Sequence, residues 1–105
     1  MRILLFLVLQ AMLSSTVSAQ FFDGDDLNEG CRAESGTFGA GLCLGFIVGV
    51  IDASGVCIPD HADLGQVRRV VRLYLKVHPD QREYSAESLV RQAIETSLKC
   101  AEEKE

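Results

Sequence analysis

The stretch of sequence that decides the fold reads FGAGLCLGFIVGVIDASGVC and spans residues 38–57. Its first sixteen residues carry a single charged side chain, Asp52, and we expect them to form a helix that is buried on most of its sides. Runs of Ile and Val also fit a strand. The glycines of this stretch recur at every fourth position, however, which places them on one face of a helix and favours the helical interpretation.

The glycine face consists of Gly41, Gly45 and Gly49, each of which costs a helix about 1 kcal/mol relative to alanine. A closely approaching neighbour would offset this cost. Close packing inside a small bundle is the simpler interpretation, and a homodimer interface is the alternative. Asp52, at the end of the same run, is explained either as a loop or cap residue or as an interface residue.

Helices are expected on both sides of this central stretch. An acidic start predicts a short helix over residues 25–32. Asp60 resembles an N-cap, and apolar residues at steps of three and four then predict a helix that ends near Val77. Ser85 is a further N-cap, and its apolar stripe predicts a last helix closed by Cys100. The expected fold class is therefore all-α, a small disulfide-linked bundle of about four helices.

Four cysteines, Cys31, Cys43, Cys57 and Cys100, are expected to form two disulfides. The helix between Cys43 and Cys57 would separate them by roughly 15–20 Å, whereas bridged Cα atoms lie within about 7 Å. An up-down bundle favours Cys31–Cys43 with Cys57–Cys100, and the crossed pairing, Cys31–Cys57 with Cys43–Cys100, is the alternative. Zinc is the competing use of four cysteines, but no pair has the two-residue spacing of zinc fingers and ribbons.

Residues 1–19 are predicted to be a signal peptide. Arg2 precedes an apolar run over residues 3–13, and Val17-Ser18-Ala19 places small residues before a cleavage site. The run of about eleven residues is shorter than the roughly twenty that a transmembrane helix needs. We therefore expect cleavage near Ala19, export to the periplasm, and a single helical domain over residues 20–105 whose small core depends on the disulfides.

Charge and residue types argue against several classes of function. Cleavage removes Arg2 and no acid, so the formal net charge of −5 becomes one unit more negative. An acidic chain without an evident basic patch is expected to bind neither nucleic acid nor, after cleavage, a membrane. No serine lies in a Gly-x-Ser-x-Gly motif, and we expect no catalytic residue, no cofactor and no metal.

One polar cluster fits an enzyme, namely Asp60, His61 and Asp63, which could bind a metal or orient an imidazole. The simpler interpretation places all three in the solvated first turn of a helix, where acids are favoured. The candidate interface residues are Gly41, Gly45, Gly49, Asp52, Asp60 and His61.

A longer series of motifs runs through the chain. It comprises CLGFIVGVID at residues 43–52, then Cys57-Ile58-Pro59, Gly65-Gln66-Val67, Val70-Val71, Tyr74-Leu75, His78-Pro79, Ser85-Ala86, Leu89-Val90, Ala93 and Cys100. In this order and spacing the chain resembles the Rap1a/Tai immunity protein family over roughly residues 21–100. It departs from the family pattern at Phe46, where Tyr is common, and at Leu98-Lys99, where Phe-Pro is common.

The resemblance implies a small, all-helical periplasmic protein that is often a homodimer. Characterised members of the family bind a type VI secretion amidase that cleaves peptidoglycan peptides, and they block its catalytic cleft sterically, without chemistry of their own. The expected partner is therefore a secreted amidase effector. A general periplasmic stress or chaperone-like binding protein without a cognate toxin, whose dimer opens at low pH, is the alternative function.

Overall fold

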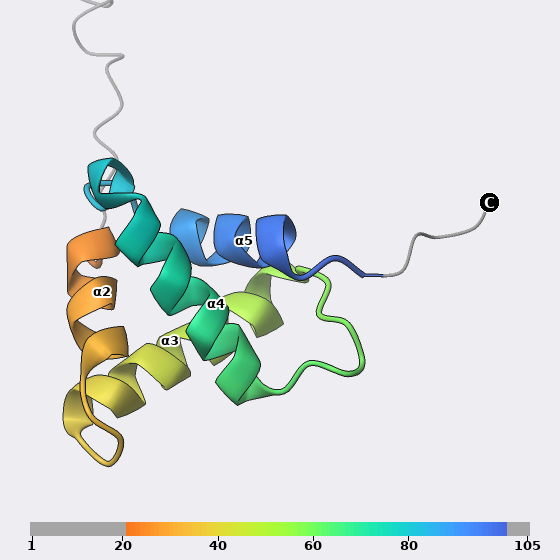
Figure 1. Ribbon diagram of the computed structural model, residues 1–105, viewed down its shortest axis with the longest axis horizontal. Helices are drawn as coiled ribbons and strands as arrows, with labels where there is room; N and C mark the ends of the chain where they lie inside the picture. Colours follow the sequence, from red (N-terminus) through yellow and green to blue (C-terminus); the bar gives the residue numbers. More distant parts are fainter. Residues whose placement is uncertain (1–20, 101–105) are drawn as a thin grey trace, which may run out of the picture.

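The computed structural model describes residues 21–100. Four α-helices follow one another in this range (Figure 1): α2 (Gly24–Arg32), α3 (Phe38–Ser54), α4 (Leu64–Val77) and α5 (Ala86–Ser97), with a short 3-10 turn, η1 (Pro79–Gln81), before the last. None of the described residues forms a strand, so the all-α prediction is confirmed. The predicted signal peptide, residues 1–19, lies outside the described residues.

The start of α2 is fixed by a reciprocal cap and by a close backbone contact. The Asp23 carboxylate accepts a hydrogen bond from the Asp26 N–H at 3.0 Å, and the Asp26 carboxylate accepts one from the Asp23 N–H at 3.1 Å. The Gly24 N–H donates to the Tyr84 carbonyl at 2.9 Å. A Cβ atom on Gly24 would lie 2.6 Å from the Arg82 Cα, so this approach requires glycine.

The end of α2 is joined to α3 by the Cys31–Cys43 disulfide, which we call the inner bridge. Its Cα atoms are 5.0 Å apart, and both cysteines are fully buried. From α4, one Nη of Arg68 donates to the carbonyl oxygens of Cys31 at 3.1 Å and Ala33 at 3.0 Å. These carbonyls belong to the last turn of α2, where a helix leaves its acceptors unpaired. Arg68 therefore ties α4 to the α2 terminus.

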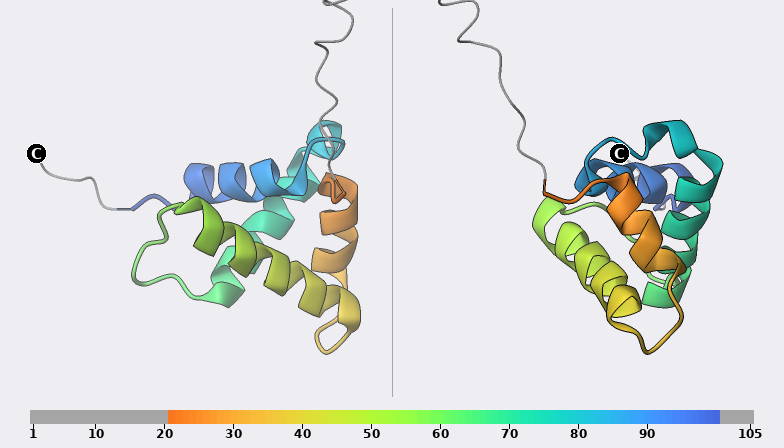
Figure 2. Two further views of the ribbon diagram at one scale, coloured as in Figure 1. Left: turned by 180° about the vertical axis from the view of Figure 1, so that it is seen from behind. Right: turned by 90° about the vertical axis from the view of Figure 1, so that its left-hand side faces the viewer.

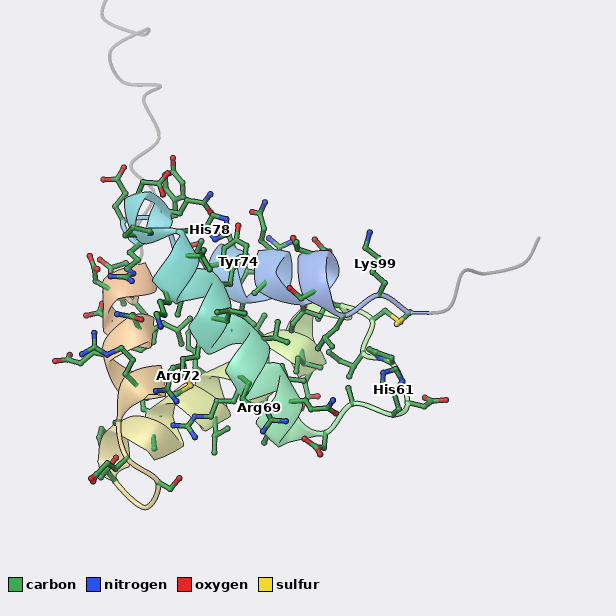
Figure 3. All side chains as sticks on the ribbon, viewed as in Figure 1. His61, Arg69, Arg72, Tyr74, His78 and Lys99 are labelled. Atoms are coloured by element: carbon green, nitrogen blue, oxygen red, sulfur yellow. A yellow bond between two sulfur atoms is a disulfide. The ribbon has the colours of Figure 1, made fainter. Side chains whose placement is uncertain are left out.

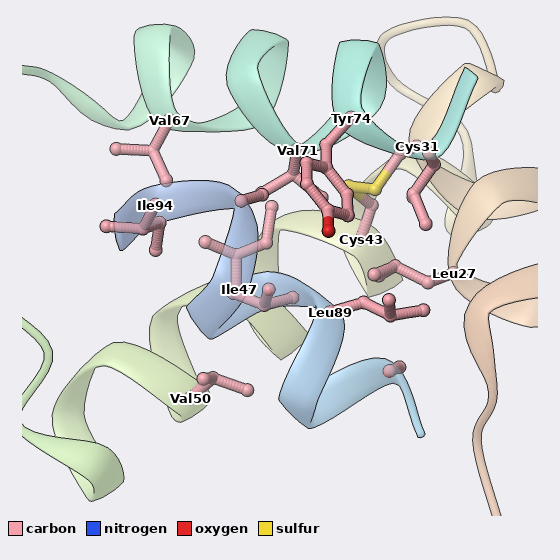
Figure 4. Packing of buried hydrophobic residues seen from close by; sticks show 14 residues of the cluster. Leu27, Cys31, Cys43, Ile47, Val50, Val67, Val71, Tyr74, Leu89 and Ile94 are labelled. Carbon is pink, nitrogen blue, oxygen red and sulfur yellow. A yellow bond between two sulfur atoms is a disulfide. The ribbon is translucent and has the colours of Figure 1, made fainter. Parts of the chain in front are cut away.

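The core lies between the four helices, and Figure 4 shows its packing around the inner bridge. It consists of Leu27, Cys31, Cys43, Ile47, Val50, Val67, Val71, Tyr74, Leu75, Ala86, Leu89, Val90, Ala93 and Ile94. Tyr74 lies at its edge, where the hydroxyl donates to the Gln81 side-chain oxygen at 2.9 Å and the ring stacks on His78 at a centroid distance of 4.0 Å. These contacts hold the corner formed by η1.

The second disulfide, which we call the outer bridge, joins Cys57 to Cys100 with Cα atoms 6.2 Å apart. Figures 1 and 2 show that α3 and α5 run in similar directions, so their C-terminal ends lie at the same side of the bundle. The favoured pairing is thus confirmed and the crossed pairing is wrong. α5 ends at Ser97, so the expectation that Cys100 closes this helix is also wrong.

The expected N-cap at Asp60 is wrong. A hydrogen bond from the Ala62 N–H to the Pro59 carbonyl, at 3.0 Å, closes a turn that holds Asp60. The helix begins later, at Leu64, because Asp63 and Gln66 cap each other: the Asp63 carboxylate accepts from the Gln66 N–H at 2.8 Å and the Gln66 side chain accepts from the Asp63 N–H at 3.1 Å.

The expectation that the helix over residues 38–53 is buried on most sides is wrong. α3 buries a single stripe, formed by Ala40, Cys43, Ile47 and Val50. The expected close packing of Gly41, Gly45 and Gly49 inside the bundle is wrong for the same reason. Among residues 21–100, no atom from outside the adjoining part of α3 would lie within 4 Å of a Cβ on any of them. The three remaining helices cover only one side of α3.

The one-sided burial of α3 predicts opposite costs for two adjacent substitutions. Ile47 is fully buried, whereas Val48 is 39% exposed. We expect Ile47→Ala to lower the free energy of unfolding by about 2–5 kcal/mol, because it leaves a cavity in the core. Val48→Ala should change it by less than about 1 kcal/mol. Urea denaturation followed by circular dichroism measures both values, and equal costs would contradict the described orientation of α3.

The two bridges should also differ in their rates of reduction. Cys57 is exposed and Cys100 is half-buried, whereas the inner bridge is fully buried. Because an attacking thiolate needs access to a sulfur atom, dithiothreitol should reduce the outer bridge first in the folded protein. Alkylation followed by peptide mass spectrometry identifies the freed thiols, with urea-unfolded protein as the control. Equal reduction rates in the folded protein would exclude this difference in accessibility.

Candidate functional site

The outward side of α3 is an uncovered apolar surface, which we call the α3 face. In the left view of Figure 2, α3 crosses the front of the molecule without another helix over it. Phe38 is 85% exposed, Leu42 42% and Val48 39%. By helical spacing these side chains share one side of α3 with the glycines and Asp52. The face is formed by Phe38, Gly41, Leu42, Gly45, Val48, Gly49 and Asp52, all exposed.

The glycines make the middle of the α3 face shallow. Apart from the adjoining backbone of α3, no atom of the described residues lies within 4 Å of the Cβ positions of Gly41, Gly45 and Gly49. A partner can therefore approach the helix backbone closely along this line, as small residues allow at helix–helix contacts. The sequence identified these glycines and Asp52 as candidate interface residues, and the structure places all four on the same surface.

The other two candidates, Asp60 and His61, lie in the loop over residues 55–63. This loop starts at Gly55, whose positive φ of 71° ends α3 in a left-handed cap. The outer bridge anchors the loop at Cys57, and Pro59, within the loop, is buried. Asp60 and His61 are exposed, and Figure 3 shows His61 on the loop. The six predicted residues thus lie on two consecutive segments of the chain.

The alternative of an enzyme or metal site at Asp60, His61 and Asp63 gains no support. The Asp63 carboxylate is occupied by the cap of α4. Within residues 21–100 there is no group of three His, Cys, Asp or Glu side chains that could hold a metal ion. The geometry of this segment is that of a loop with exposed polar side chains.

A second surface, which the sequence analysis missed, is a groove of about 660 Å³ between α2 and α4. We call it the basic groove; it is lined by Asn28, Arg32, Arg69, Arg72, Leu73, Lys76 and Arg82. Figure 3 shows Arg69 and Arg72 on the visible side of α4. The expectation of no basic patch is therefore wrong. α4 carries four cations and no acid, which is a signal that the sequence contained.

The cations of the groove differ from Arg91 on α5 in their ion pairing. Arg91 forms an ion pair with Glu87, and hydrogen bonding to that carboxylate raises the pKa of Arg91. This is the one ion pair among the described residues, so none of the groove cations is paired there.

The chain matches the model of a known protein family. A family model described as Rap1a immunity proteins matches residues 23–100, from the N-cap of α2 to the last cysteine of the outer bridge. No curated protein and no solved structure matches the chain. In the part of the chain that is described, no helix is long and apolar enough to cross a membrane.

Two glycine substitutions test whether the α3 face is open. Gly45→Ala should raise the free energy of unfolding by up to about 1 kcal/mol, because alanine is the better helix former and nothing obstructs its Cβ. Gly24→Ala should lower it by about 1–3 kcal/mol through overpacking, since its Cβ would lie 2.5 Å from the Leu89 Cδ1. Urea denaturation at two protein concentrations measures both. A destabilised Gly45→Ala variant would contradict an open face in the monomer.

Proposed function

Because the chain belongs to the Rap1a immunity protein family, we propose that it is a periplasmic immunity protein that binds a type VI secretion amidase and blocks its catalytic cleft. Membership of this family implies a protein effector as the partner. The choice of an amidase, the periplasmic location and the steric mechanism are part of the proposal. The observation that carries it is the α3 face, an apolar surface on the most apolar helix that no other described element covers.

The α3 face and the following loop suit recognition of a folded partner. The face offers exposed Phe38, Leu42 and Val48 around a shallow line of glycines. Aromatic and aliphatic side chains of this kind form the desolvated centre of protein–protein interfaces. The loop with Asp60 and His61 supplies polar groups beside such a centre. We propose that the effector contacts both segments.

The disulfides support a steric mechanism. The outer bridge fixes one end of the loop over residues 55–63, and the inner bridge fixes the start of α3. Segments that are ordered before binding lose less conformational entropy when a complex forms. A protein built in this way blocks a cleft by occupying it, and the mechanism needs no reactive group.

A second copy of the chain is the other candidate occupant of the α3 face. Glycines at every fourth position allow two helix backbones to approach closely, which is the observation that favours a homodimer. In such a dimer the loop with Asp60 and His61 would remain available for the effector. Sedimentation of the purified protein distinguishes the two arrangements.

The chaperone-like alternative requires a core that opens in acid. Within residues 21–100 the buried side chains are apolar apart from Asn28 and the hydroxyl of Tyr74, and none of them is a carboxylate or a histidine. Acid therefore finds no buried carboxylate or histidine to protonate in this part of the chain, and protonation of exposed groups does not require the core to open. A hydrophobic dye added during acid titration should show no increase in binding before global unfolding.

The proposed function predicts protection of a cell that carries the amidase in its periplasm. The cognate amidase is sought as a small papain-like enzyme with a Cys/His pair in the neighbouring reading frame. We expect co-expression of this chain to prevent lysis, and the two proteins to co-purify. Lysis despite co-expression, with no complex, would exclude the proposal.

Two single substitutions test whether the effector binds the α3 face. Gly45→Arg places a long cation at the centre of the α3 face, where nothing obstructs it, and should weaken the complex by roughly tenfold or more. Thr96→Arg, on an exposed position of α5, is the matched control and should leave affinity unchanged. Retained affinity in Gly45→Arg, with a folded protein by circular dichroism, would move the interface away from α3.

A further inference from the structure

The basic groove gathers positive charge on a chain whose formal net charge is −5. Its lining contains five cations, Arg32, Arg69, Arg72, Lys76 and Arg82, and no acid. Within residues 21–100 the ion pair lies elsewhere, between Arg91 and Glu87, and no acid of that range pairs with a groove cation. Like charges held together in this way are stabilised by an anion that enters between them.

The wall of the groove also holds an unpaired amide. Asn28 is only 6% exposed and lines the groove, and its side-chain oxygen has no hydrogen-bond partner within residues 21–100. A buried acceptor without a donor destabilises the folded state. Rotation of the amide exchanges its oxygen with its NH₂ group, so that Asn28 can accept from an N–H group or donate to a carboxylate in the groove.

Three chemical features of the basic groove therefore define the kind of ligand that it can bind. The guanidinium groups pair with carboxylates in a two-pronged geometry. The Asn28 side chain can form hydrogen bonds with a peptide amide of the ligand. Leu73, which is 62% exposed, offers an apolar contact. The volume of about 660 Å³ accommodates several residues and is far larger than an inorganic anion needs. A short peptide with acidic side chains combines carboxylates, amides and apolar atoms.

We propose that the basic groove binds an acidic peptide segment of a protein partner. That this partner is a secreted effector rests on the proposed function, whereas the preference of the groove for acidic peptide does not. Arg32, Arg69, Arg72 and Lys76 bind the carboxylates, and Asn28 binds the peptide backbone. The groove uses α2 and α4, so it is separate from the α3 face.

The charges outside the groove favour a short peptide segment as its ligand over an extended polyanion such as a membrane or a nucleic acid duplex. The first turn of α2 carries Asp25 and Asp26, and the chain as a whole is acidic. A membrane or a duplex would meet these acids as well as the groove. Since screening limits charge effects to about 8 Å at physiological salt, a peptide inside the groove is affected mainly by the cations that surround it.

A titration of the isolated, disulfide-bonded protein tests the proposal without any amidase. The probe is the peptide Glu-Glu-Leu-Glu-Glu with blocked ends, added to ¹⁵N-labelled protein and followed by NMR. We expect saturable shifts of the Asn28 side-chain amide and of α4 backbone amides. The peptide Gln-Gln-Leu-Gln-Gln and inorganic phosphate should bind at least tenfold more weakly.

Two charge reversals of equal size complete the test. Arg72→Glu should weaken binding of the acidic peptide at least tenfold. Lys99→Glu reverses an exposed cation that does not line the groove, and should change affinity less than twofold. Equal loss in both variants, no shift at Asn28, or binding only to phosphatidylglycerol vesicles or to a DNA duplex would overturn the proposal. Because no effector is used, these outcomes neither support nor contradict the proposed immunity function, which the co-expression experiment tests separately.

Discussion

The inner bridge is the constraint on which the rest of the structure depends. Cys31 and Cys43 are both fully buried, so this covalent link is part of the core and not an addition at its surface. It sets the crossing of α2 and α3, and Gly30 adapts to it: a Cβ there would lie 2.8 Å from the Gly39 carbonyl oxygen. α4 then packs against this pair through its buried stripe of Val67, Val71 and Leu75, and Arg68 ties it to the last turn of α2.

Local signals made most of the helix positions predictable. Ser85 caps α5, α4 ends at Val77, and the length of α3 correctly excluded a Cys43–Cys57 disulfide. These features depend on neighbouring residues and on helix rise, which a sequence states directly. The start of α4 was misplaced because Asp60 and Asp63 are both plausible caps, and only the reciprocal bond with Gln66 distinguishes them.

The tertiary contacts of the helices were predicted less well than the positions of the helices in the sequence. An apolar stretch such as α3 looks fully buried when only its own residues are considered, yet burial also requires enough neighbouring chain to surround it, and three short helices do not suffice. The basic groove was missed for a related reason. Arg32 and Arg72 lie far apart in the sequence, and each reads as an ordinary solvated side chain until packing brings α2 beside α4.

The outer bridge has a consequence for how the chain is made. Synthesis runs from the N-terminus, so Cys31 and Cys43 become available together while Cys57 still lacks Cys100, its partner 43 residues later. Once formed, α3 acts as a rigid spacer that keeps the waiting thiol away from the earlier pair. A product that stops short of residue 100 therefore carries an unpaired thiol at Cys57, and unfinished copies are chemically distinguishable from complete ones by this thiol.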